Sequence, residues 1–203
     1  AQAVTQLHAI SRVREVTRVV GLDTEPDVAA SFPDRVAFLD LPVEIVPADR
    51  AETIVGEVDV LCTCTSAELG ADPVVADTDH APWLHVNAVG ADVPGKIELP
   101  ASRARRALVI PDTLEQCLVE GECQQVPVDR IGPSLAEVVQ RETEFARART
   151  ELTVFDSTGW AVEDDVALRL AVDLAERHGL GTDVQLERIP PDPHDPYAVE
   201  LPS

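Results

Sequence analysis

Short aliphatic runs alternate with stretches of helical periodicity along most of the chain. The runs predict six strands, at residues 16–22, 43–46, 58–65, 84–89, 107–110 and 152–155. Apolar faces at helical spacing, with polar residues before them, predict helices at residues 3–10, 25–31, 49–55, 113–120, 134–140 and 161–177. Because strands that alternate with helices pair in parallel, the pattern predicts an α/β fold with a doubly wound parallel sheet.

The first predicted helix, residues 3–10, begins almost at the first residue of the sequence. Val4, Leu7 and Ile10 lie on one face of it. In a Rossmann-type nucleotide unit, a strand and a G-x-G-x-x-G turn stand directly before such a helix, and the sequence contains neither. We therefore expect a Rossmann-type sheet that lacks its first strand and glycine turn. The strand order 3-2-1-4-5-6 would then have a hole in its middle.

The C-terminal part of the chain has a different pattern. The helix at 161–177 is followed by two glycines that act as stop signals, and the segment from Pro190 onward is rich in proline and polar residues. Such a segment is typical of an extended surface tail. The sequence thus predicts a nucleotide-binding domain at residues 1–160, incomplete at its N-terminus, and a C-terminal helix and tail at 161–203.

The composition is that of a globular protein. Apolar residues make up 45% and charged residues 26% of the 203 residues, and the mean hydropathy is near zero. Aromatic residues are only 3%, which favours an aliphatic core of the kind found in parallel sheets. With no run of ~20 apolar residues and no signal peptide, we expect no membrane association and a cytoplasmic location.

The net charge of −21 argues against nucleic acid or an anionic membrane as a partner, since a phosphate backbone needs a basic face. An acidic surface that keeps the protein soluble is the simpler explanation. The four cysteines lack the paired C-x-x-C spacing of zinc sites, so we expect buried free thiols and no metal. The sequence also has no G-x-S-x-G elbow and no complete Walker A loop, which gives hydrolase and P-loop functions no support.

Asp23 follows the predicted strand 16–22, about 20 residues after the place of the missing glycine turn. A carboxylate there accepts hydrogen bonds from both ribose hydroxyls and repels a 2′-phosphate, so it selects NAD over NADP. An ordinary loop aspartate in an acidic protein is the alternative.

Residues 84–99 (LHVNAVGADVPGKIEL) predict a strand that ends in a polar loop. In open α/β sheets, ligands bind at the carboxyl ends of strands. Gly90 would let the backbone approach a cofactor closely. Asp92 could orient or deprotonate an amine, and Lys96 could contact a phosphate or a carboxylate. A solvated turn is the alternative.

Residues 155–164 (FDSTGWAVED) predict a strand end followed by Ser-Thr-Gly and a helix. Free N–H groups and hydroxyls at a helix N-terminus stabilise anionic or polar ligand groups. Glu163 and Asp164 also suit the first turn of a helix, and a capping role is the favoured one for these two.

Three stretches together resemble the ornithine cyclodeaminase/mu-crystallin family. Residues 1–3 (AQA) look like the end of the family's G-x-G-A-Q-A turn. Residues 85–99 (HVNAVGADVPGKIEL) and 153–176 (TVFDSTGWAVEDDVALRLAVDLAE) resemble its two longest motifs. The resemblance runs from Ala1 to about Tyr197, and the spacings between the motifs fit without gaps.

The resemblance implies a set of site residues, position by position. Those that match NAD contacts are Ala1, Gln2, Asp23, Thr65, Asn87, Ala88, Val89, Gly90, Lys96 and Ser157. Asp92 matches the acid/base residue that handles the substrate amine, and Thr158 lies where the family touches its substrate.

The resemblance also implies an activity. In ornithine cyclodeaminases, hydride leaves Cα of L-ornithine for NAD⁺, the δ-amine attacks the resulting imino acid, ammonia departs, and hydride returns to give L-proline. The FDSTGWAVED motif is closer to this branch than to the ketimine reductases. The family implies a small amino-acid substrate and a homodimer in the full-length form.

One departure from the family concerns its other domain, which supplies arginine and lysine side chains for the substrate carboxylate. That domain lies upstream of Ala1, and the helix and tail at 161–203 would pack toward it. We therefore expect this chain alone to bind NAD poorly and to turn over nothing. Two alternatives stay open: an NAD(P)H-dependent ketimine reductase or amino-acid dehydrogenase, and a non-catalytic truncated protein that binds a nucleotide or a partner.

Overall fold

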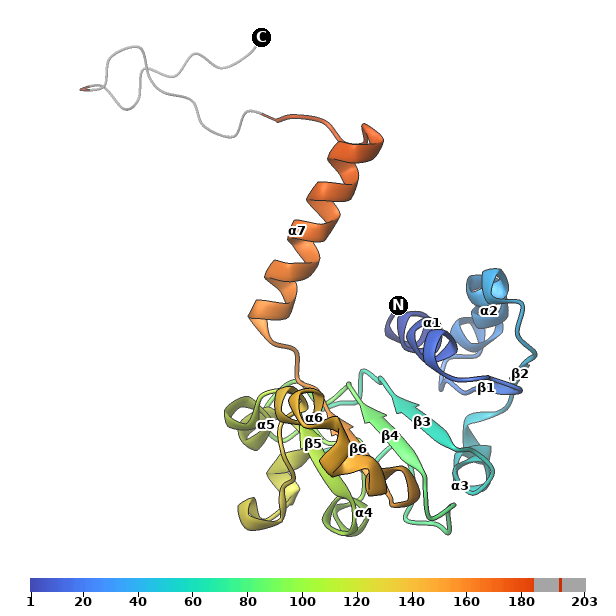
Figure 1. Ribbon diagram of the computed structural model, residues 1–203. Helices are drawn as coiled ribbons and strands as arrows, with labels where there is room; N and C mark the ends of the chain where they lie inside the picture. The colour runs from blue at the N-terminus through green and yellow to red at the C-terminus, as the bar shows by residue number, and fades with distance from the viewer. Residues whose placement is uncertain (185–193, 195–203) are drawn as a thin grey trace. The chain divides into compact units, whose positions relative to one another are not determined.

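The computed structural model describes residues 1–184 and residue 194. It divides into two compact units, Ala1–Trp160 and Ala161–Ser203, each described here by itself (Figure 1). The tail predicted from Pro190 onward lies outside the described residues, apart from residue 194.

Six parallel strands form two sheets in the first unit. Their bounds are β1 Val19–Gly21, β2 Val43–Ile45, β3 Val60–Thr63, β4 His85–Ala88, β5 Leu108–Pro111 and β6 Thr153–Asp156. One sheet has the order β1-β2 and the other the order β3-β4-β6-β5, and all strand pairs are parallel. This confirms the predicted α/β fold with parallel strands.

The sheet is interrupted where the sequence predicts its hole. Among the strands of the described residues, β1 pairs only with β2, and β3 pairs only with β4. In the predicted order, β1 and β3 are the two strands that flank the missing first strand. Among the described residues each of them therefore has one edge without a strand partner, a state that natural sheets usually avoid.

Seven α-helices accompany the strands in the described part of the chain. Their bounds are α1 Gln2–Val13, α2 Pro26–Val36, α3 Ala51–Val55, α4 Ala101–Arg106, α5 Leu114–Glu120, α6 Leu135–Gln140 and α7 Ala161–His178. Sequence reasoning missed α4, because its ASRARR sequence has no apolar period and its buried residues are Arg103 and Ala104. The start of α6 is fixed by a capping box between Ser134 and Glu137, whose side chains each bind the other residue's backbone N–H.

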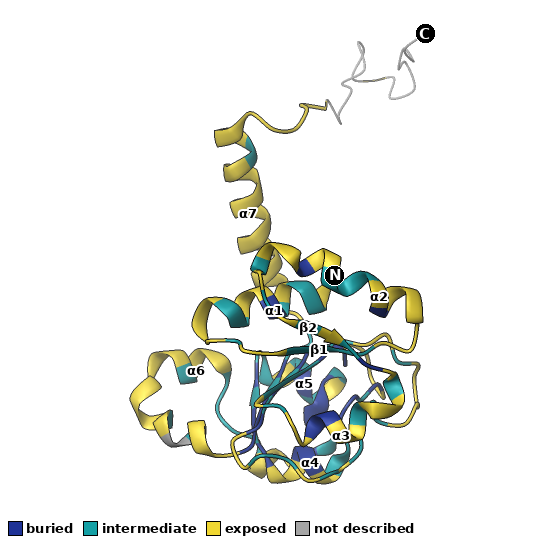
Figure 2. Cartoon of the chain, turned by 90° about the vertical axis from the view of Figure 1, so that its right-hand side faces the viewer, coloured by how far each residue is buried: buried dark blue, intermediate teal, exposed yellow. Residues whose placement is uncertain are grey.

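The hydrophobic core packs the four-stranded sheet against helices that include α3 and α4, whose buried residues are dark blue in Figure 2. Val86, Val109 and Val154, from β4, β5 and β6, are fully buried, as are Leu84 and Leu99. Side chains alternate between the two faces of a strand, so the neighbours of these valines face the other side and are mostly only half-buried. The aliphatic core expected from the composition is thus present.

The four cysteines differ in how deeply they are buried. Cys117 and Cys123 are buried free thiols, as predicted, but Cys62 and Cys64 are only half-buried. The difference arises because Cys62 lies on β3 and pairs in register with the half-buried Asn87, away from the core. Burial is still sufficient to raise the pKa of Cys62 to about 11, so this thiol is protonated at neutral pH.

The second unit is built around α7. None of the residues of this helix, all of which are described, is buried, and its leucines Leu168, Leu170 and Leu174 are exposed. Glu163 and Asp164 lie in its first turn, where acidic residues are stabilised by the helix dipole. Within the described residues, no helix has the length and apolar character needed to cross a membrane.

Candidate functional site

The predicted site residues follow the carboxyl ends of the parallel strands. Asp23 comes two residues after β1, Thr65 two residues after β3, and Gly90 two residues after β4, while Ser157 directly follows β6. In the four-stranded sheet these ends share one edge, since all its strands run in the same direction. The structure therefore brings Thr65, Gly90 and Ser157 to the same edge.

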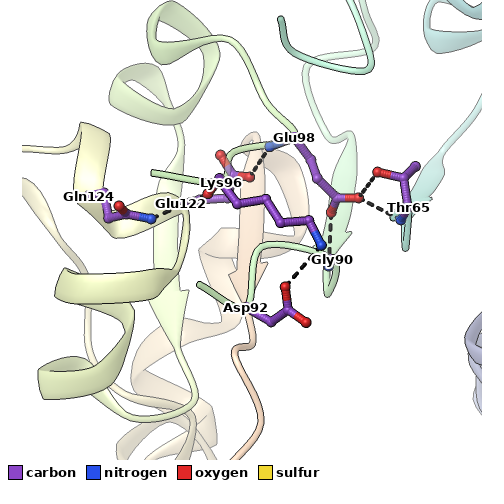
Figure 3. A network of polar contacts seen from close by, with 7 residues as sticks. All are labelled: Thr65, Gly90, Asp92, Lys96, Glu98, Glu122 and Gln124. Atoms are coloured by element: carbon purple, nitrogen blue, oxygen red, sulfur yellow. Dashed lines mark hydrogen bonds and ion pairs between the residues drawn. The ribbon is translucent and has the colours of Figure 1, made fainter. Parts of the chain in front are cut away.

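A carboxylate that sequence reasoning missed joins two of these loops (Figure 3). Glu98 Oε1 accepts hydrogen bonds from the backbone N and the hydroxyl of Thr65, each at 2.7 Å, and Oε2 accepts from the backbone N of Gly90 at 2.9 Å. The Glu98 side chain is fully buried. A Cβ atom at position 90 would overlap this carboxylate. The glycine is thus required here by Glu98, a reason different from the close cofactor approach inferred from the sequence.

Asp92 and Lys96 form an ion pair in the loop after β4. The Lys96 Nζ atom lies 2.9 Å from Asp92 Oδ1, and the side chains are 10% and 58% exposed, respectively. Lys96 is therefore covered by protein, while the Asp92 carboxylate reaches the surface. Asp92 thus presents an exposed carboxylate, a group that can exchange a proton with an adjacent amine.

Two more buried carboxylates continue the network behind this loop. Glu122 Oε1 accepts from the backbone N of Glu98 at 2.6 Å, and Asp156 accepts from the backbone N atoms of Glu122 and Cys123 at 2.9 and 2.8 Å. Burial raises the pKa of Glu122 to about 8, against the opposing effect of its backbone hydrogen bonds. Burial also raises the pKa of Asp156. The Glu122 side chain therefore carries a proton over much of the neutral range.

The Ser-Thr-Gly loop after β6 is anchored by another carboxylate that the sequence did not reveal. Asp112 Oδ2 accepts from the Ser157 hydroxyl at 2.8 Å and from the backbone N atoms of Thr158 and Gly159 at 3.0 and 3.2 Å. The expectation that these N–H groups are free for a ligand is therefore wrong, because Asp112 already binds them. The Thr158 hydroxyl oxygen is different: it is buried and has no hydrogen-bond partner among the described residues.

The side chain of Asn87 belongs to a polar ladder across the four-stranded sheet. Asn87 Nδ2 donates to Gln6 Oε1 of α1 at 2.9 Å, and Asn87 Oδ1 lies 2.9 Å from His85 Nε2. His85 Nδ1 lies 2.7 Å from the Thr153 hydroxyl. Burial lowers the pKa of His85, which favours the neutral imidazole and a structural role in this ladder. Asn87 thus ties α1 to β4, and neighbouring Ala88 is buried.

The start of α1 and Asp23 lie at the surface of the unit. α1, which lies wholly within the described residues, has no acidic residue in its first turn and no capping side chain, and both Ala1 and Gln2 are exposed. Its free N–H groups can receive the oxygens of a phosphate. Asp23 is exposed, and its Oδ1 atom accepts the backbone N of Glu25 at 2.9 Å. A helix N-terminus and an exposed carboxylate fit the pyrophosphate and ribose of a dinucleotide.

A model of the ornithine cyclodeaminase/mu-crystallin family matches residues 1–179. The chain belongs to this family. This confirms the resemblance inferred from the AQA turn and the two long motifs. Among curated members of the family, L-lysine cyclodeaminase of Streptomyces rapamycinicus is 43% identical over 199 residues, which cover 98% of this chain and 57% of that protein. Ornithine cyclodeaminase of Brucella suis is 34% identical over 158 residues, 78% of this chain and 44% of that protein.

Solved structures of the cyclodeaminase family have the same fold. A lysine cyclodeaminase, studied for its recognition of L-lysine, L-ornithine and L-2,4-diamino butyric acid, has a TM-score of 0.88 and 45% identity and covers 98% of this chain and 57% of its own. The Thermococcus litoralis Δ(1)-pyrroline-2-carboxylate reductase, in complex with NADH and L-proline, has a TM-score of 0.79 and 28% identity, covering 90% and 58%. The iminosuccinate reductase of Paracoccus denitrificans, in complex with NAD⁺, has a TM-score of 0.75 and 28% identity, covering 91% and 57%. The chain thus spans less than two thirds of the length of these family members.

Proposed function

We propose that this chain is the dinucleotide-binding part of an NAD-dependent cyclodeaminase. The proposed reaction converts L-ornithine into L-proline and ammonia through an imino acid. The Asp92–Lys96 pair carries the proposal, since it presents an exposed carboxylate, held by a covered amine, beside the loops of Thr65 and Gly90. The 43% identity to a lysine cyclodeaminase supports cyclisation of a diamino acid and makes L-lysine the competing substrate.

The surface of the first unit offers groups for each part of NAD. The free N–H groups of α1 suit the pyrophosphate, and Asp23 suits the adenosine ribose. The loops that begin at Thr65, Asn87 and Ser157 suit the nicotinamide side. When bound there, NAD⁺ would supply a hydride acceptor and donor at the substrate carbon, and the complete cycle would have no net redox change.

The residues of this chain handle protons and orientation in the proposed reaction. The Asp92 carboxylate takes a proton from the substrate α-amine as that carbon is oxidised, and later returns one to the departing ammonia. Lys96 orients this carboxylate through their 2.9 Å ion pair. Thr158 lies in the loop after β6, where the family resemblance implies a substrate contact.

The decisive experiment uses protein expressed from the complete coding sequence. With L-ornithine and catalytic NAD⁺, we expect one L-proline and one ammonia per ornithine consumed and no net NADH. With L-lysine the same chemistry gives the six-membered ring, so the ratio of kcat/KM values identifies the preferred substrate. Net NADH consumption with a cyclic ketimine or a 2-oxo acid would instead make the protein a reductase or dehydrogenase, and absence of any turnover would leave a binding role.

Asp92→Asn tests the proposed proton transfer. We expect kcat to fall by about 10²–10⁴-fold, the usual contribution of a positioned acid/base group. Asp129→Asn, on an exposed aspartate far along the chain, is the matched control and should keep full activity. Equal activity of the two variants would remove Asp92 from the reaction.

The open edges of β1 and β3 predict a requirement for further sequence. We expect the 203-residue chain alone to bind NADH weakly and to show no turnover. Fusion to the segment of the Streptomyces L-lysine cyclodeaminase that precedes the matched region should restore NADH binding and turnover. The fusion protein should also form the homodimer that the family implies. Proline formation at an enzymatic rate by the chain alone would contradict this prediction.

A further inference from the structure

The Glu98 carboxylate is the only group among the described residues that binds both the Thr65 and the Gly90 loops (Figure 3). Thr65 supplies two donors to Oε1 and Gly90 supplies one to Oε2. These three hydrogen bonds connect the loop after β3 to the loop after β4. Thr65 and Glu98 are 33 residues apart in the sequence. This buried side chain therefore extends the connection between the two loops beyond the end of the β3–β4 ladder, where Val89 N donates to Thr63 O at 2.9 Å.

The backbone of Glu98 is itself fixed on both sides. Its N–H group donates to Glu122 Oε1 at 2.6 Å, and its carbonyl accepts from the backbone N of Val74 at 2.9 Å. Glu122 lies in a segment whose own N–H groups bind Asp156 at the end of β6. A continuous chain of hydrogen bonds thus runs from the Thr65 loop to the strand that precedes Ser157.

We infer that Glu98 is a positioning residue of the cofactor site. Its carboxylate holds the Thr65 and Gly90 loops at the spacing that the dinucleotide requires between them. This inference rests on the proposed function, because it needs those loops to receive NAD. We call the Glu98 carboxylate with its three hydrogen bonds to Thr65 and Gly90 the clamp. The Thr65 hydroxyl is part of this clamp, since it is bound to Glu98 Oε1.

The chemistry of the clamp shows why a carboxylate is needed. Donors reach both oxygens, and hydrogen bonds to an ionised acceptor are about twice as strong as neutral ones. Glutamine has nearly the same shape but would place an N–H₂ group against either Gly90 N or the Thr65 donors. The mismatched loop would then separate from position 98 and lose its spacing.

Glu122 provides a matched control. It is also fully buried, and it accepts its hydrogen bonds from Glu98 N, Leu99 N and Gln125 Nε2. Two of these donors are backbone groups of residues 98 and 99, and none of the three belongs to Thr65 or Gly90. Glutamine at position 122 keeps an acceptor oxygen for Glu98 N, so this variant leaves the hydrogen bonds from Glu98 to both loops in place. If the role of Glu98 were purely structural, the same substitution at positions 98 and 122 should change NADH binding equally.

The test compares Glu98→Gln with Glu122→Gln in the protein from the complete coding sequence. NADH binding is measured by fluorescence titration, and the KM values for NAD⁺ and for the diamino acid are measured separately. We expect Glu98→Gln to raise the NADH Kd and the NAD⁺ KM by about 10–100-fold, with a diamino-acid KM within about threefold of wild type. Glu122→Gln should leave the NADH Kd within about threefold.

Equal effects of the two variants, or an unchanged NADH Kd in Glu98→Gln, would overturn the inference. Failure of the wild-type protein to bind NADH would instead overturn the proposed function, so the two failures are distinct. If Glu98→Gln does not fold, Glu98→Asp keeps the charge while shortening the reach, and should raise the NADH Kd in the same direction. Adding Thr65→Val to the Glu98 variant should cause no further loss if the hydroxyl acts through Glu98, and an additive loss would contradict that assignment.

Discussion

The two sheets of residues 1–160 differ in how completely their strands are buried. In the four-stranded sheet, Val86, Val109 and Val154 are fully buried, and both β4 and β6 have a partner on each side. In the two-stranded sheet, by contrast, no residue of β1 or β2 is fully buried, and each strand has one partner in the described structure. The strands that have a partner on each side are thus also the strands that are buried. Both a partner on each edge and a covered face are needed to exclude water from a parallel strand.

The same difference divides the candidate site. The Thr65, Gly90 and Ser157 loops are each held by buried or half-buried carboxylates at the edge of the four-stranded sheet. Asp23 and Gln2 lie with the two-stranded sheet, where both are exposed. The predicted nicotinamide side is therefore preorganised in this chain, and the predicted ribose and pyrophosphate side is much less constrained.

The largest expected effect is in amide hydrogen exchange. Backbone amides in 85–88 and 153–156 should exchange at least about a thousandfold more slowly than those in 19–21 and 43–45, a difference of about 4 kcal/mol in opening free energy. The reason is that local opening of β1 and β2 exposes little buried apolar surface. Exchange measured by NMR or by mass spectrometry of the isolated chain provides the test. Similar protection of both sheets would show that the open edges do not weaken the smaller one.

The strands could be predicted from the sequence because aliphatic runs mark parallel strands directly. Val60–Thr63 and His85–Ala88 lie inside the predicted runs, with each end trimmed by one or two residues. The interruption between β1 and β3 also followed from the missing glycine turn. α4 could not be predicted, since Arg103 and Ala104 are buried without any apolar periodicity around them.

The site was predicted less completely than the fold. Asp92 and Lys96 are four residues apart on a recognisable motif, and the structure brings them together. Glu98 lies inside the 84–99 motif, but its role as a contact between loops could not be seen there. Glu122 and Asp112 gave no signal, because they are single acids among 37 Asp and Glu residues and their partners are distant in sequence. Only the folded chain reveals which acids are buried. The network around them has no local pattern.

Glycine substitutions should affect the stability of the two sheets differently. A Cβ at Gly90 would overlap the fixed Glu98 carboxylate, whereas a Cβ at Gly21 would meet the end of the Ile45 side chain, Cδ1, at 2.9 Å. We expect Gly90→Ala to lower the free energy of unfolding by about 2–3 kcal/mol and Gly21→Ala by less than about 1 kcal/mol, since the isoleucine can change rotamer. Urea denaturation measures both. A larger effect at Gly21 would mean that the β1–β2 region is packed as rigidly as the larger sheet.

The buried carboxylates predict a pH dependence that is smaller, over any single pH unit, than the effect of Gly90→Ala. The pKa of Glu122 is raised by burial to about 8, so the folded state holds a proton that the unfolded state releases near pH 4.5. Its contribution to stability is complete below pH 4.5 and is lost as the pH rises toward 8, with a slope of at most about 1.4 kcal/mol per pH unit. The difference in unfolding free energy between wild type and Glu122→Gln, measured by urea denaturation from pH 5 to 9, should follow this curve. A difference that grows with pH would contradict the sign of the shift.

The smallest expected effect concerns a link between the two regions. Gln6 of α1 accepts a hydrogen bond from Asn87 of β4 at 2.9 Å. α1 also packs against α2, the helix between the two strands of the two-stranded sheet. Gln6→Ala should lower the free energy of unfolding by about 1 kcal/mol, the net value of one such bond, while Gln2→Ala on the exposed start of the same helix should change it by less than half as much. Hydrogen exchange then shows how far the loss spreads. Faster exchange confined to α1, β1 and β2 would mean that the smaller sheet opens as a separate unit tethered through Asn87, and faster exchange in β4 and β6 as well would mean that the two sheets unfold together despite their interruption.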